Sequence, residues 1–492
     1  METVLGIDVG TSSTKGVLTT LTGEVLASGV REHQVARPRT GHVEMDPDVW
    51  WEEFASLSRE LTQAHPAAQV KAVGVSGMGP CLALVDGEYR PVRPAILYGV
   101  DTRATDEIEE WKARLGGDDA LLQRCGSTLT TQAVGPKVAW VARHEPDVYA
   151  RARRFFMPAS WLAFHLTGEY VLDHQSASQS TPLYDIEARQ WYRPWADQIA
   201  PGLELPTLKW AGEVAGQVTA EASAATGLPV GVPVTVGTID AWSEALSVDA
   251  HNPGDLMLMY GTTLFFINTV TEPVRDVSLW GTVGALEGTR NVAGGMATSG
   301  AITGWLRELF GSPEFAVLVE EADAAGVGAH GLVMLPYFAG ERTPLMDPDA
   351  RGVIAGLSLR HTRGDLYRAA LEATGFAVRH NIETIEEAGG SIERIVAVGG
   401  GTKSDVWAQI VTDITGRPQV IPRESIGASY GIAWLATQLV TPIPAAEWNP
   451  PVRVIEPRPE NAQAYEELYE LFRSLYPATA PIAHALAARQ QD

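Results

Sequence analysis

Residues 4–20 read VLGIDVGTSSTKGVLTT, and this stretch determines how the chain begins to fold. Apolar and β-branched runs at 4–9 and 16–21 flank a short loop of Gly, Thr, Ser and Lys residues at 10–15. A third run at 24–28 follows a Thr-Gly turn at 22–23. The pattern therefore predicts two consecutive β-hairpins, with Asp8 near the end of the first strand.

The loop at 10–15 has the composition of a phosphate site. Glycines and hydroxyl residues between strands can present several backbone N–H groups and hydroxyls to one concavity, which suits a phosphate. A carboxylate beside the loop, such as Asp8, can hold Mg²⁺ directly or through water. The alternative is a plain hairpin turn with an Asp at the strand end. The spacing is not that of a P-loop, which excludes that class of nucleotide site.

A similar strand–loop–strand pattern occurs near the middle of the chain. Runs at 255–260 and 264–267 flank Gly261-Thr262-Thr263. Glycine- and proline-rich segments at 227–233 and 252–254 bracket the midpoint of the chain, and we place a domain boundary near 245–255. We therefore expect two domains of related topology, at residues 1–248 and 249–492.

Two further segments could carry chemistry. Asp240 follows an apolar run at 232–236, where its carboxylate could act as a general base or could cap a helix that starts at Ala241. Three glycines at 399–401 join a strand at 395–398 to a helix expected from Ser404 to a stop at Gly416. Such glycines suit either close approach of a ligand or a sharp strand-to-helix turn. An amphipathic helix is expected over about 460–475.

The composition limits the classes of partner. The 492 residues include 37 Lys and Arg against 60 Asp and Glu, a net charge of −23, which disfavours nucleic acid and anionic membrane surfaces. A hydrophobic content of 45% argues against disorder, and two cysteines offer no disulfide framework. Without a recognisable signal peptide or an apolar run of about 18 residues, we expect a soluble cytoplasmic protein.

Together, these motifs resemble the FGGY family of carbohydrate kinases. Residues 6–15 are similar to the first phosphate loop of that family, 237–240 to the segment with its catalytic Asp, 261–263 to its second phosphate loop, and 399–404 to its adenosine loop. Residues 352–357 with 365–372 are similar to its C-terminal signature. The resemblance runs through nearly the whole chain. It implies an α/β fold of two actin/hexokinase-like (ribonuclease H-like) domains with a cleft between them.

The resemblance also implies an activity and a set of roles. The activity is ATP-dependent phosphorylation of a primary hydroxyl of a ketose or polyol, with a pentulose such as D-xylulose as the first candidate. Asp240 would be the catalytic base, and Asp8 and Asp240 would hold Mg²⁺. The remaining residues would bind phosphates (Thr11, Ser12, Ser13, Lys15, Gly261, Thr262 and Thr263), adenosine (Gly400, Gly401 and Ser404) or the sugar (Gly79, Pro80, Asp101, Arg103 and Asp240).

The sugar segments depart from the xylulose kinase branch of the family. Xylulose kinases typically have a Met-His pair where this chain has Gly79-Pro80. Tyr98 begins a segment that usually reads Trp-Asn-Asp-x-Arg, and Ala241 stands where Asn is common. Tyr98, Met78 and Gln132 are candidates to refill part of the space. We therefore predict that other ketoses or polyols are substrates as well.

Alternative functions remain open at this point. The substrate could be ribulose, L-xylulose, a hexulose, erythritol or a similar polyol. A non-metabolic ATPase of the same fold group, or a catalytically silent sugar sensor, would belong to other functional classes. Asp101, Arg103 and Asp240, together with the C-terminal signature, argue against the ATPase, and the presence of both Asp8 and Asp240 argues against the silent sensor. The family resemblance is compatible with a homodimer.

Overall fold

The computed structural model describes residues 1–490, which form two compact units. Unit 1 contains Met1–His251, Trp280–Asn291 and Ile426–Pro450. Unit 2 contains Asn252–Leu279, Val292–Ser425 and the chain from Pro451 onward. The segment 426–450 therefore belongs to unit 1, although it lies in the C-terminal half of the sequence. The boundary between two sequence domains that we place between residues 248 and 249 remains a prediction.

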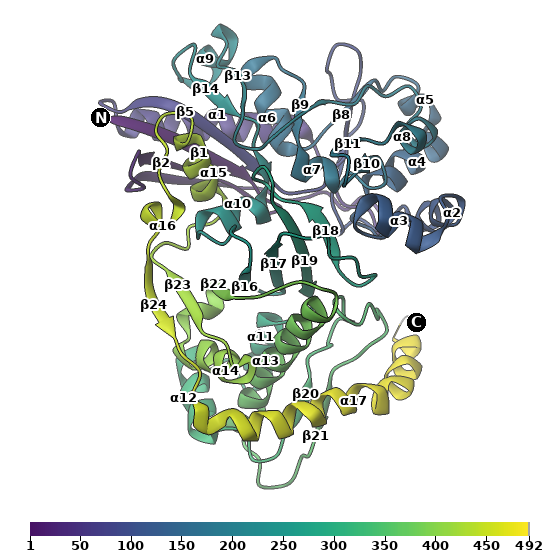
Figure 1. The fold of residues 1–492 in the computed structure, drawn as a ribbon, viewed down its shortest axis with the longest axis vertical. Helices are drawn as coiled ribbons and strands as arrows, with labels where there is room; N and C mark the ends of the chain where they lie inside the picture. Colours follow the sequence, from purple (N-terminus) through teal and green to yellow (C-terminus); the bar gives the residue numbers. More distant parts are fainter. Residues whose placement is uncertain (491–492) are drawn as a thin grey trace. The chain divides into compact units, whose positions relative to one another are not determined.

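Unit 1 is built on a mixed sheet with the strand order β13-β14-β5-β1-β2-β3, and β15 also pairs with β5 (Figure 1). Its strands are β1 (Glu2–Val9), β2 (Ser13–Thr20), β3 (Val25–Glu32), β4 (Glu44–Met45), β5 (Gln69–Gly77), β6 (Ala83–Val85), β7 (Ala95–Ile96), β8 (Arg154–Phe156), β9 (Val171–Asp173), β10 (Tyr184–Asp185), β11 (Gln190–Trp191), β12 (Thr207–Lys209), β13 (Val214–Gln217), β14 (Pro233–Thr235), β15 (Thr238–Ile239) and β18 (Trp280–Val283). The predicted hairpins are confirmed, because β1 and β2, and then β2 and β3, pair antiparallel.

The helices of unit 1 cover both faces of this sheet. They are α1 (Pro47–Ala64), α2 (Thr105–Arg114), α3 (Gly117–Cys125), α4 (Val134–His144), α5 (Pro146–Tyr149), α6 (Pro158–Thr167), α7 (His174–Ser178), α8 (Arg193–Ile199), α9 (Ala220–Thr226), α10 (Asp240–Ser247), α15 (Ala428–Thr437) and α16 (Ala445–Trp448). Helices α10 and α15 pack against each other, and α15 lies on β1 and β5 (Figure 1). Glycine is required under α15, because a Cβ at Gly6 or Gly74 would lie 2.2 Å from a backbone oxygen of that helix.

Unit 2 has a second sheet with the order β19-β17-β16-β22-β23-β24. Its elements are β16 (Asp255–Tyr260), β17 (Leu264–Val270), β19 (Arg290–Met296), α11 (Gly300–Leu309), α12 (Phe315–Ala325), β20 (Val333–Leu335), β21 (Val353–Ala355), α13 (Arg363–Glu387), β22 (Arg394–Gly399), the 3₁₀ helix η1 (Gly400–Lys403), α14 (Asp405–Thr415), β23 (Gln419–Pro422), β24 (Pro451–Ile455), the 3₁₀ helix η2 (Pro459–Asn461) and α17 (Ala462–Arg489). The antiparallel pair β16–β17 beside the parallel pair β16–β22 repeats the arrangement of β1, β2 and β5. The related topology of the two halves is therefore confirmed.

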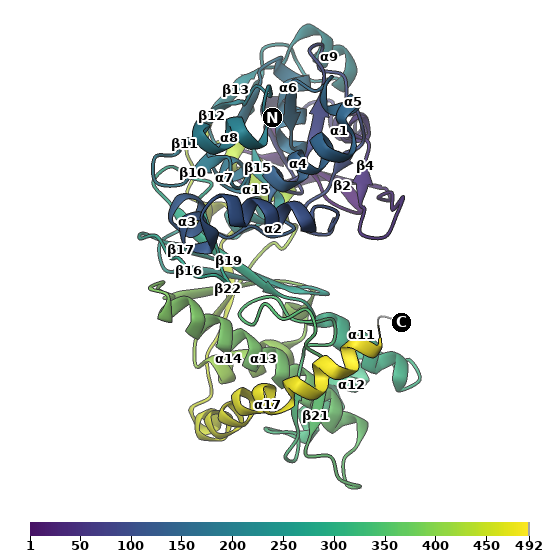
Figure 2. The same cartoon turned by 90° about the vertical axis from the view of Figure 1, so that its right-hand side faces the viewer.

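Each unit has its own apolar core, and that of unit 2 lies between its sheet and helices α13, α14 and α17. Figure 2 shows α17 running past α13 and α14. This helix is longer than the sequence predicts, because it continues to Arg489 through Pro477 and Pro481. Tyr465, Tyr469 and Phe472 bury its inner face against α13.

Candidate active site

Two acidic side chains lie at the ends of β1 and β15, the two strands that flank β5 in unit 1. In the parallel registers, Ser76 of β5 lies opposite Asp8 of β1 on one side and opposite Thr238 of β15 on the other. Asp240 follows two residues after Thr238. Because parallel strands end at one edge of a sheet, Asp8 and Asp240 are brought to the same place. The Ser76 hydroxyl donates to Oδ1 of Asp8 at 2.9 Å.

Asp240 is the first residue of α10 and does not cap it. Ile239 is the N-cap residue, and Oδ1 of Asp240 accepts a hydrogen bond from the N–H of Ala241 at 2.8 Å. The alternative interpretation of Asp240 as an N-cap is therefore wrong. Glu244 lies one helical turn further along α10, which places it on the same side as Asp240. Our sequence interpretation missed Glu244, although the spacing of four residues in a short helix could have indicated it.

The three carboxyl groups raise the proton affinity of the site. Burial raises the pKa of Asp240 to about 6 and that of Glu244 to about 7. Burial, and then the charge of Asp240, raise the pKa of Asp8 to about 8, while the Ser76 hydrogen bond opposes this shift. Lys15 lowers the pKa of both Glu244 and Asp8. Such shifts are typical of residues that exchange protons or hold cations.

The first phosphate loop is anchored by side chains that lie far away in the sequence. The Thr11 and Tyr98 hydroxyls are hydrogen-bonded at 2.8 Å. On the other side, the His33 ring contacts the carbonyl of Gly10 through Nε2 at 3.0 Å and Glu53 through Nδ1 at 2.9 Å. Ser12, Ser13 and Lys15 keep exposed surface beside these anchors. Sequence reasoning missed His33 and Glu53, because nothing local connects them to the loop.

Asp101 and Arg103 lie together in unit 1 but are fully buried. The Arg103 guanidinium donates to Oδ2 of Asp101 at 2.7 Å and to Oε1 of Glu44 at 2.7 Å, and neither Asp101 nor the Arg103 side chain is exposed. Asp101 also accepts from the N–H of Val43 at 2.6 Å. In this structure the pair holds the segment 98–103 in place, and direct contact with a sugar would require a neighbouring group to move.

The space beside Gly79 is filled by Ile239. A Cβ on Gly79 would lie 2.7 Å from Cγ1 and 2.8 Å from Cδ1 of Ile239, the residue directly before Asp240. Pro80 and Met78 are buried next to it. Where the family resemblance led us to consider a Met-His pair, the chain has Gly79-Pro80, and the apolar Ile239 occupies the space that a side chain at position 79 would need.

The second phosphate loop lies in unit 2 and is held by its backbone. The Gly261 N–H donates to the Thr263 carbonyl at 3.0 Å, and the Thr262 carbonyl accepts from the N–H groups of Ser299 and Ala301, both at 3.0 Å. The side chains of Thr262 and Thr263 are exposed. Their hydroxyls are accessible to a ligand.

The glycine loop at 399–401 makes a tight turn at Gly399 and leaves the backbone uncovered at Gly400. Gly399 has φ +89°, and a Cβ there would lie 2.4 Å from the Tyr260 carbonyl oxygen, whereas a Cβ on Gly400 would meet nothing within 4 Å. Ser404 caps α14 by accepting from the N–H of Trp407 at 3.3 Å, and Gly416 ends that helix as expected. Gly400 thus leaves room for a ligand, while Gly399 is required by the fold.

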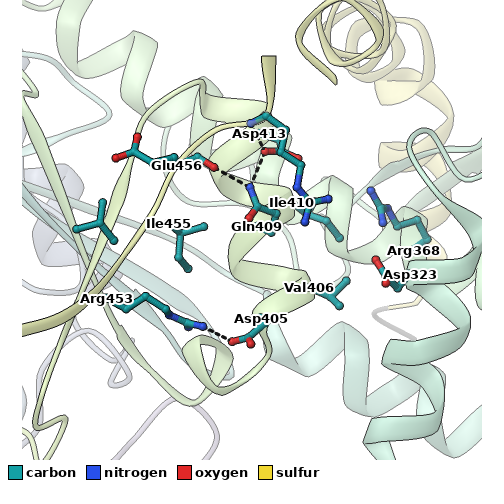
Figure 3. A pocket seen from close by; sticks show the side chains of 12 residues that line it. Asp323, Arg368, Asp405, Val406, Gln409, Ile410, Asp413, Arg453, Ile455 and Glu456 are labelled. Carbon is teal, nitrogen blue, oxygen red and sulfur yellow. Dashed lines mark hydrogen bonds and ion pairs between the residues drawn. The ribbon is translucent and has the colours of Figure 1, made fainter. Parts of the chain in front are cut away.

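A cavity of about 420 Å³ is lined on one side by α14 residues that follow Ser404, among them Val406, Gln409 and Ile410 (Figure 3). Most of its polar groups are already paired: Arg453 donates to Asp405 at 2.6 Å, and Gln409 donates to Asp413 at 2.8 Å. Gly400, Gly401 and Ser404 do not line it. The cavity is therefore separate from the residues we expect at the adenosine.

The residues similar to the C-terminal family signature have structural partners in unit 2. Asp365 accepts from the N–H of Thr362 at 2.6 Å in a capping box that begins α13. Glu372, one of the last residues of the signature, accepts from Arg368 at 2.8 Å inside the unit. These contacts stabilise α13 and give the signature a role in folding.

Asp8 and Asp240 suit a Mg²⁺ ion by their oxygen chemistry and by their mutual repulsion, which a cation would relieve. Between residues 1 and 490 no group of three or more His, Cys, Asp or Glu side chains is arranged to hold a metal ion. Water and phosphate oxygens would therefore have to complete the coordination, as is usual for Mg²⁺. No helix within the same residues is long and apolar enough to span a membrane.

Comparisons with known proteins agree with the geometry. Residues 3–247 match the N-terminal domain, and residues 256–439 the C-terminal domain, of the FGGY family of carbohydrate kinases. The xylulose kinase of Staphylococcus xylosus is 27% identical over 97% of this chain and 100% of its own length. The gluconokinase of Bacillus subtilis is 28% identical over 87% of this chain and 86% of its own. The crystal structure of xylulose kinase from Rhodospirillum rubrum superposes with a TM-score of 0.92 and 32% identity, over 98% of this chain and 100% of that one.

Proposed function

Because the chain belongs to the FGGY family of carbohydrate kinases, we propose that it phosphorylates a ketose at a primary hydroxyl with ATP, and that D-xylulose, giving the 5-phosphate, is a substrate. The observation that carries this proposal is that Asp8 and Asp240 lie at the same edge of the sheet, at the ends of the two strands that flank β5. The full-length similarity to xylulose kinases supports the choice of sugar. The expected fold of two actin/hexokinase-like domains is confirmed.

In the proposed reaction, the sugar hydroxyl oxygen forms a bond to the γ-phosphorus of ATP while the bond from that phosphorus to the β,γ-bridging oxygen breaks. Asp240 accepts the hydroxyl proton, and ADP leaves. Mg²⁺, held near Asp8 and Asp240, would offset the phosphate charge. Lys15 and the hydroxyls of Ser12 and Ser13 bind phosphate oxygens in unit 1.

Residues of unit 2 bind the rest of the nucleotide in this proposal. The exposed Thr262 and Thr263 hydroxyls and the Gly261 loop are suited to phosphate oxygens. Gly400, Gly401 and Ser404 are suited to the adenosine, because Gly400 leaves its backbone open and Ser404 begins α14. Asp101 and Arg103 shape the sugar segment, and Gly79 and Pro80 form part of its wall.

A second group of substrates is favoured by Ile239. An apolar side chain in the space beside Gly79 offers no hydrogen bond to a sugar hydroxyl, so discrimination at that carbon should be weak. We therefore propose that at least one other ketose or polyol is used with a kcat/KM comparable to that for D-xylulose. The similarity to a gluconokinase makes gluconate a necessary member of any substrate panel.

An ADP-release screen of the purified protein over ketoses, polyols and gluconate tests the proposal. We expect D-xylulose and at least one other ketose or polyol to stimulate ADP release. Release that no sugar stimulates would contradict the kinase assignment. A preference for D-xylulose of more than about 100-fold would contradict the broader specificity, and gluconate as the best substrate would overturn the choice of a ketose.

The proposed Mg²⁺ role of Asp8 is tested by Asp8→Asn. A neutral amide holds a hydrated divalent cation poorly, so the variant should need more Mg²⁺ for half-maximal rate. Calorimetric titration of Mg²⁺ with a non-hydrolysable ATP analogue gives a second readout that does not depend on turnover. Superimposable titrations of variant and wild type would leave Asp8 with a structural role.

A further inference from the structure

The start of the sugar segment touches the first phosphate loop through one pair of hydroxyls. Tyr98 and Thr11 lie 87 residues apart in the sequence, and their side-chain oxygens are 2.8 Å apart. Both residues are half-buried. Thr11 belongs to the loop that we expect to bind phosphate, while Tyr98 begins the segment that holds Asp101 and Arg103.

Tyr98 is set in a segment with little freedom to move. Its carbonyl accepts from the N–H of Asp101 at 3.0 Å. Next to it, Gly99 donates through its N–H to Gln132 at 2.9 Å and accepts through its carbonyl from the Thr131 hydroxyl at 3.1 Å. A Cβ on Gly99 would lie 2.7 Å from the Gln132 side chain, so the two are in close contact. A change in this segment would therefore reach the Tyr98 hydroxyl.

The Thr11 hydroxyl can serve Tyr98 and a phosphate at the same time. A hydroxyl donates one hydrogen bond and accepts up to two. When Tyr98 donates to Thr11, the proton of Thr11 is left to donate to a phosphate oxygen, and successive hydrogen bonds of this kind polarise one another. The other side of the loop is fixed by His33, which binds the Gly10 carbonyl.

We propose that Tyr98 is a positioning residue that couples the sugar segment to the first phosphate loop, so that a bound sugar strengthens nucleotide binding through the Tyr98–Thr11 hydrogen bond. The inference rests on the proposed kinase function. Coupling of this kind is reciprocal, so the nucleotide strengthens sugar binding by the same factor.

Calorimetry of a non-hydrolysable ATP analogue with Mg²⁺, with and without the best sugar from the substrate panel, tests the proposal. The sugar should lower the Kd of the analogue for wild type. The size of the effect is the ratio of the Kd without sugar to the Kd with sugar. In Tyr98→Phe, which removes only the hydroxyl, we expect this ratio to be about three- to tenfold smaller than in wild type, as is typical of the loss of one hydrogen bond. Thr11→Val should do the same, and the double variant should be no worse than either single one.

The control is Tyr149→Phe, which removes a hydroxyl that donates to the Pro201 carbonyl at 2.9 Å, away from this segment. It should behave as wild type. Additive effects in the double variant, an unchanged sugar effect in Tyr98→Phe, or no sugar effect in wild type would overturn the inference. If the inference fails but the wild type still phosphorylates a sugar, the proposed function is unaffected. If the wild type phosphorylates no sugar, the proposed function itself is contradicted.

Discussion

The two glycine–hydroxyl loops are closed by the same kind of hydrogen bond, although the first loop is one residue longer, and they are held in different ways. In each, the glycine N–H donates at 3.0 Å to a carbonyl in the loop, that of Ser13 for Gly10 and that of Thr263 for Gly261. A Cβ on either glycine would lie 3.0–3.1 Å from that carbonyl oxygen. Both loops accept backbone N–H groups from elsewhere, that of His33 on the Ser12 carbonyl at 3.1 Å in the first and those of Ser299 and Ala301 on the Thr262 carbonyl in the second. The first loop is anchored by the side chains of Tyr98 and His33 in addition.

This difference suggests that the two loops contribute differently to catalysis and to nucleotide binding. The first loop is tied to the sugar segment by Tyr98, and Asp8 stands at the end of the strand that leads into it. The second has exposed hydroxyls on a rigid backbone and no acidic residue between 256 and 271. We therefore expect changes near the first loop to affect both chemistry and binding, and changes in the second to affect nucleotide binding alone.

The largest effect should come from Asp240→Ala. Because a general base is worth about 10²–10⁴ in rate, kcat should fall by that factor. Binding of a non-hydrolysable ATP analogue should stay within about threefold, measured by calorimetry. Asp197→Ala, an exposed acid on α8, is the matched control. Activity of Asp240→Ala within about tenfold of wild type would contradict the role of this residue and the proposed division of work.

The pH dependence of kcat should show the same base. Burial raises the pKa of Asp240 to about 6 without a metal ion, and only the ionised form accepts a proton, so kcat should fall at acid pH. Mg²⁺ beside Asp240 favours the ionised form and moves this fall to a pH below 6. Below the pKa of the base the rate should fall about tenfold per pH unit. The measurement needs saturating Mg²⁺ and sugar, so that binding does not limit the rate. A profile without any fall down to about pH 4 would show that Asp240 is not the base.

His33→Ala tests the anchor of the first loop. Without the ring, the Gly10 carbonyl and Glu53 lose a shared partner, and the loop should bind the ATP analogue about tenfold more weakly. His65→Ala removes a comparable bond, from Nε2 to the Leu26 carbonyl at 2.9 Å, and serves as the control. If both variants bind the analogue equally well, the His33 side chain does not contribute to nucleotide binding.

Thr262→Val tests the second loop with a smaller expected effect. The substitution keeps the shape of the side chain and removes one hydroxyl, so the Kd of the ATP analogue should rise about three- to tenfold. The melting temperature should not change, since the loop is held by its backbone. A fall in the melting temperature would show that the Thr262 hydroxyl also anchors the second loop.

The smallest effect is one of stability. The folded protein binds a proton on Asp8 up to about pH 8, whereas an unfolded Asp releases it near 3.8, so wild type loses stability as the pH rises between these values. Asp8→Asn removes this penalty. Its melting temperature, measured without nucleotide or metal, should exceed that of wild type by a difference that grows between pH 5 and 8, to about 4 °C. A constant difference would contradict the buried-charge explanation.

Much of the local structure follows from neighbouring residues alone. The hairpins around residues 10–15 and 261–263 and the helix from Ser404 to Gly416 were predictable, because turns and caps depend on groups a few residues apart. The order of these motifs also indicated the family. Helix α17 was predicted too short, because its part beyond 475 is held by distant contacts, in which Tyr476 and His484 both bind Asp347, and continues through two prolines.

The sequence by itself therefore determined the elements, the two related halves and the identity of Asp8 and Asp240. Only the tertiary structure decided that Ile239 fills the space at Gly79, that Asp101 and Arg103 are buried in an ion pair, and that His33 and Tyr98 hold the first loop. Apart from the Asp101–Arg103 pair itself, these contacts join residues about 20 to 160 positions apart. No local periodicity encodes such a pairing, since it depends on which strands become neighbours in the folded sheet.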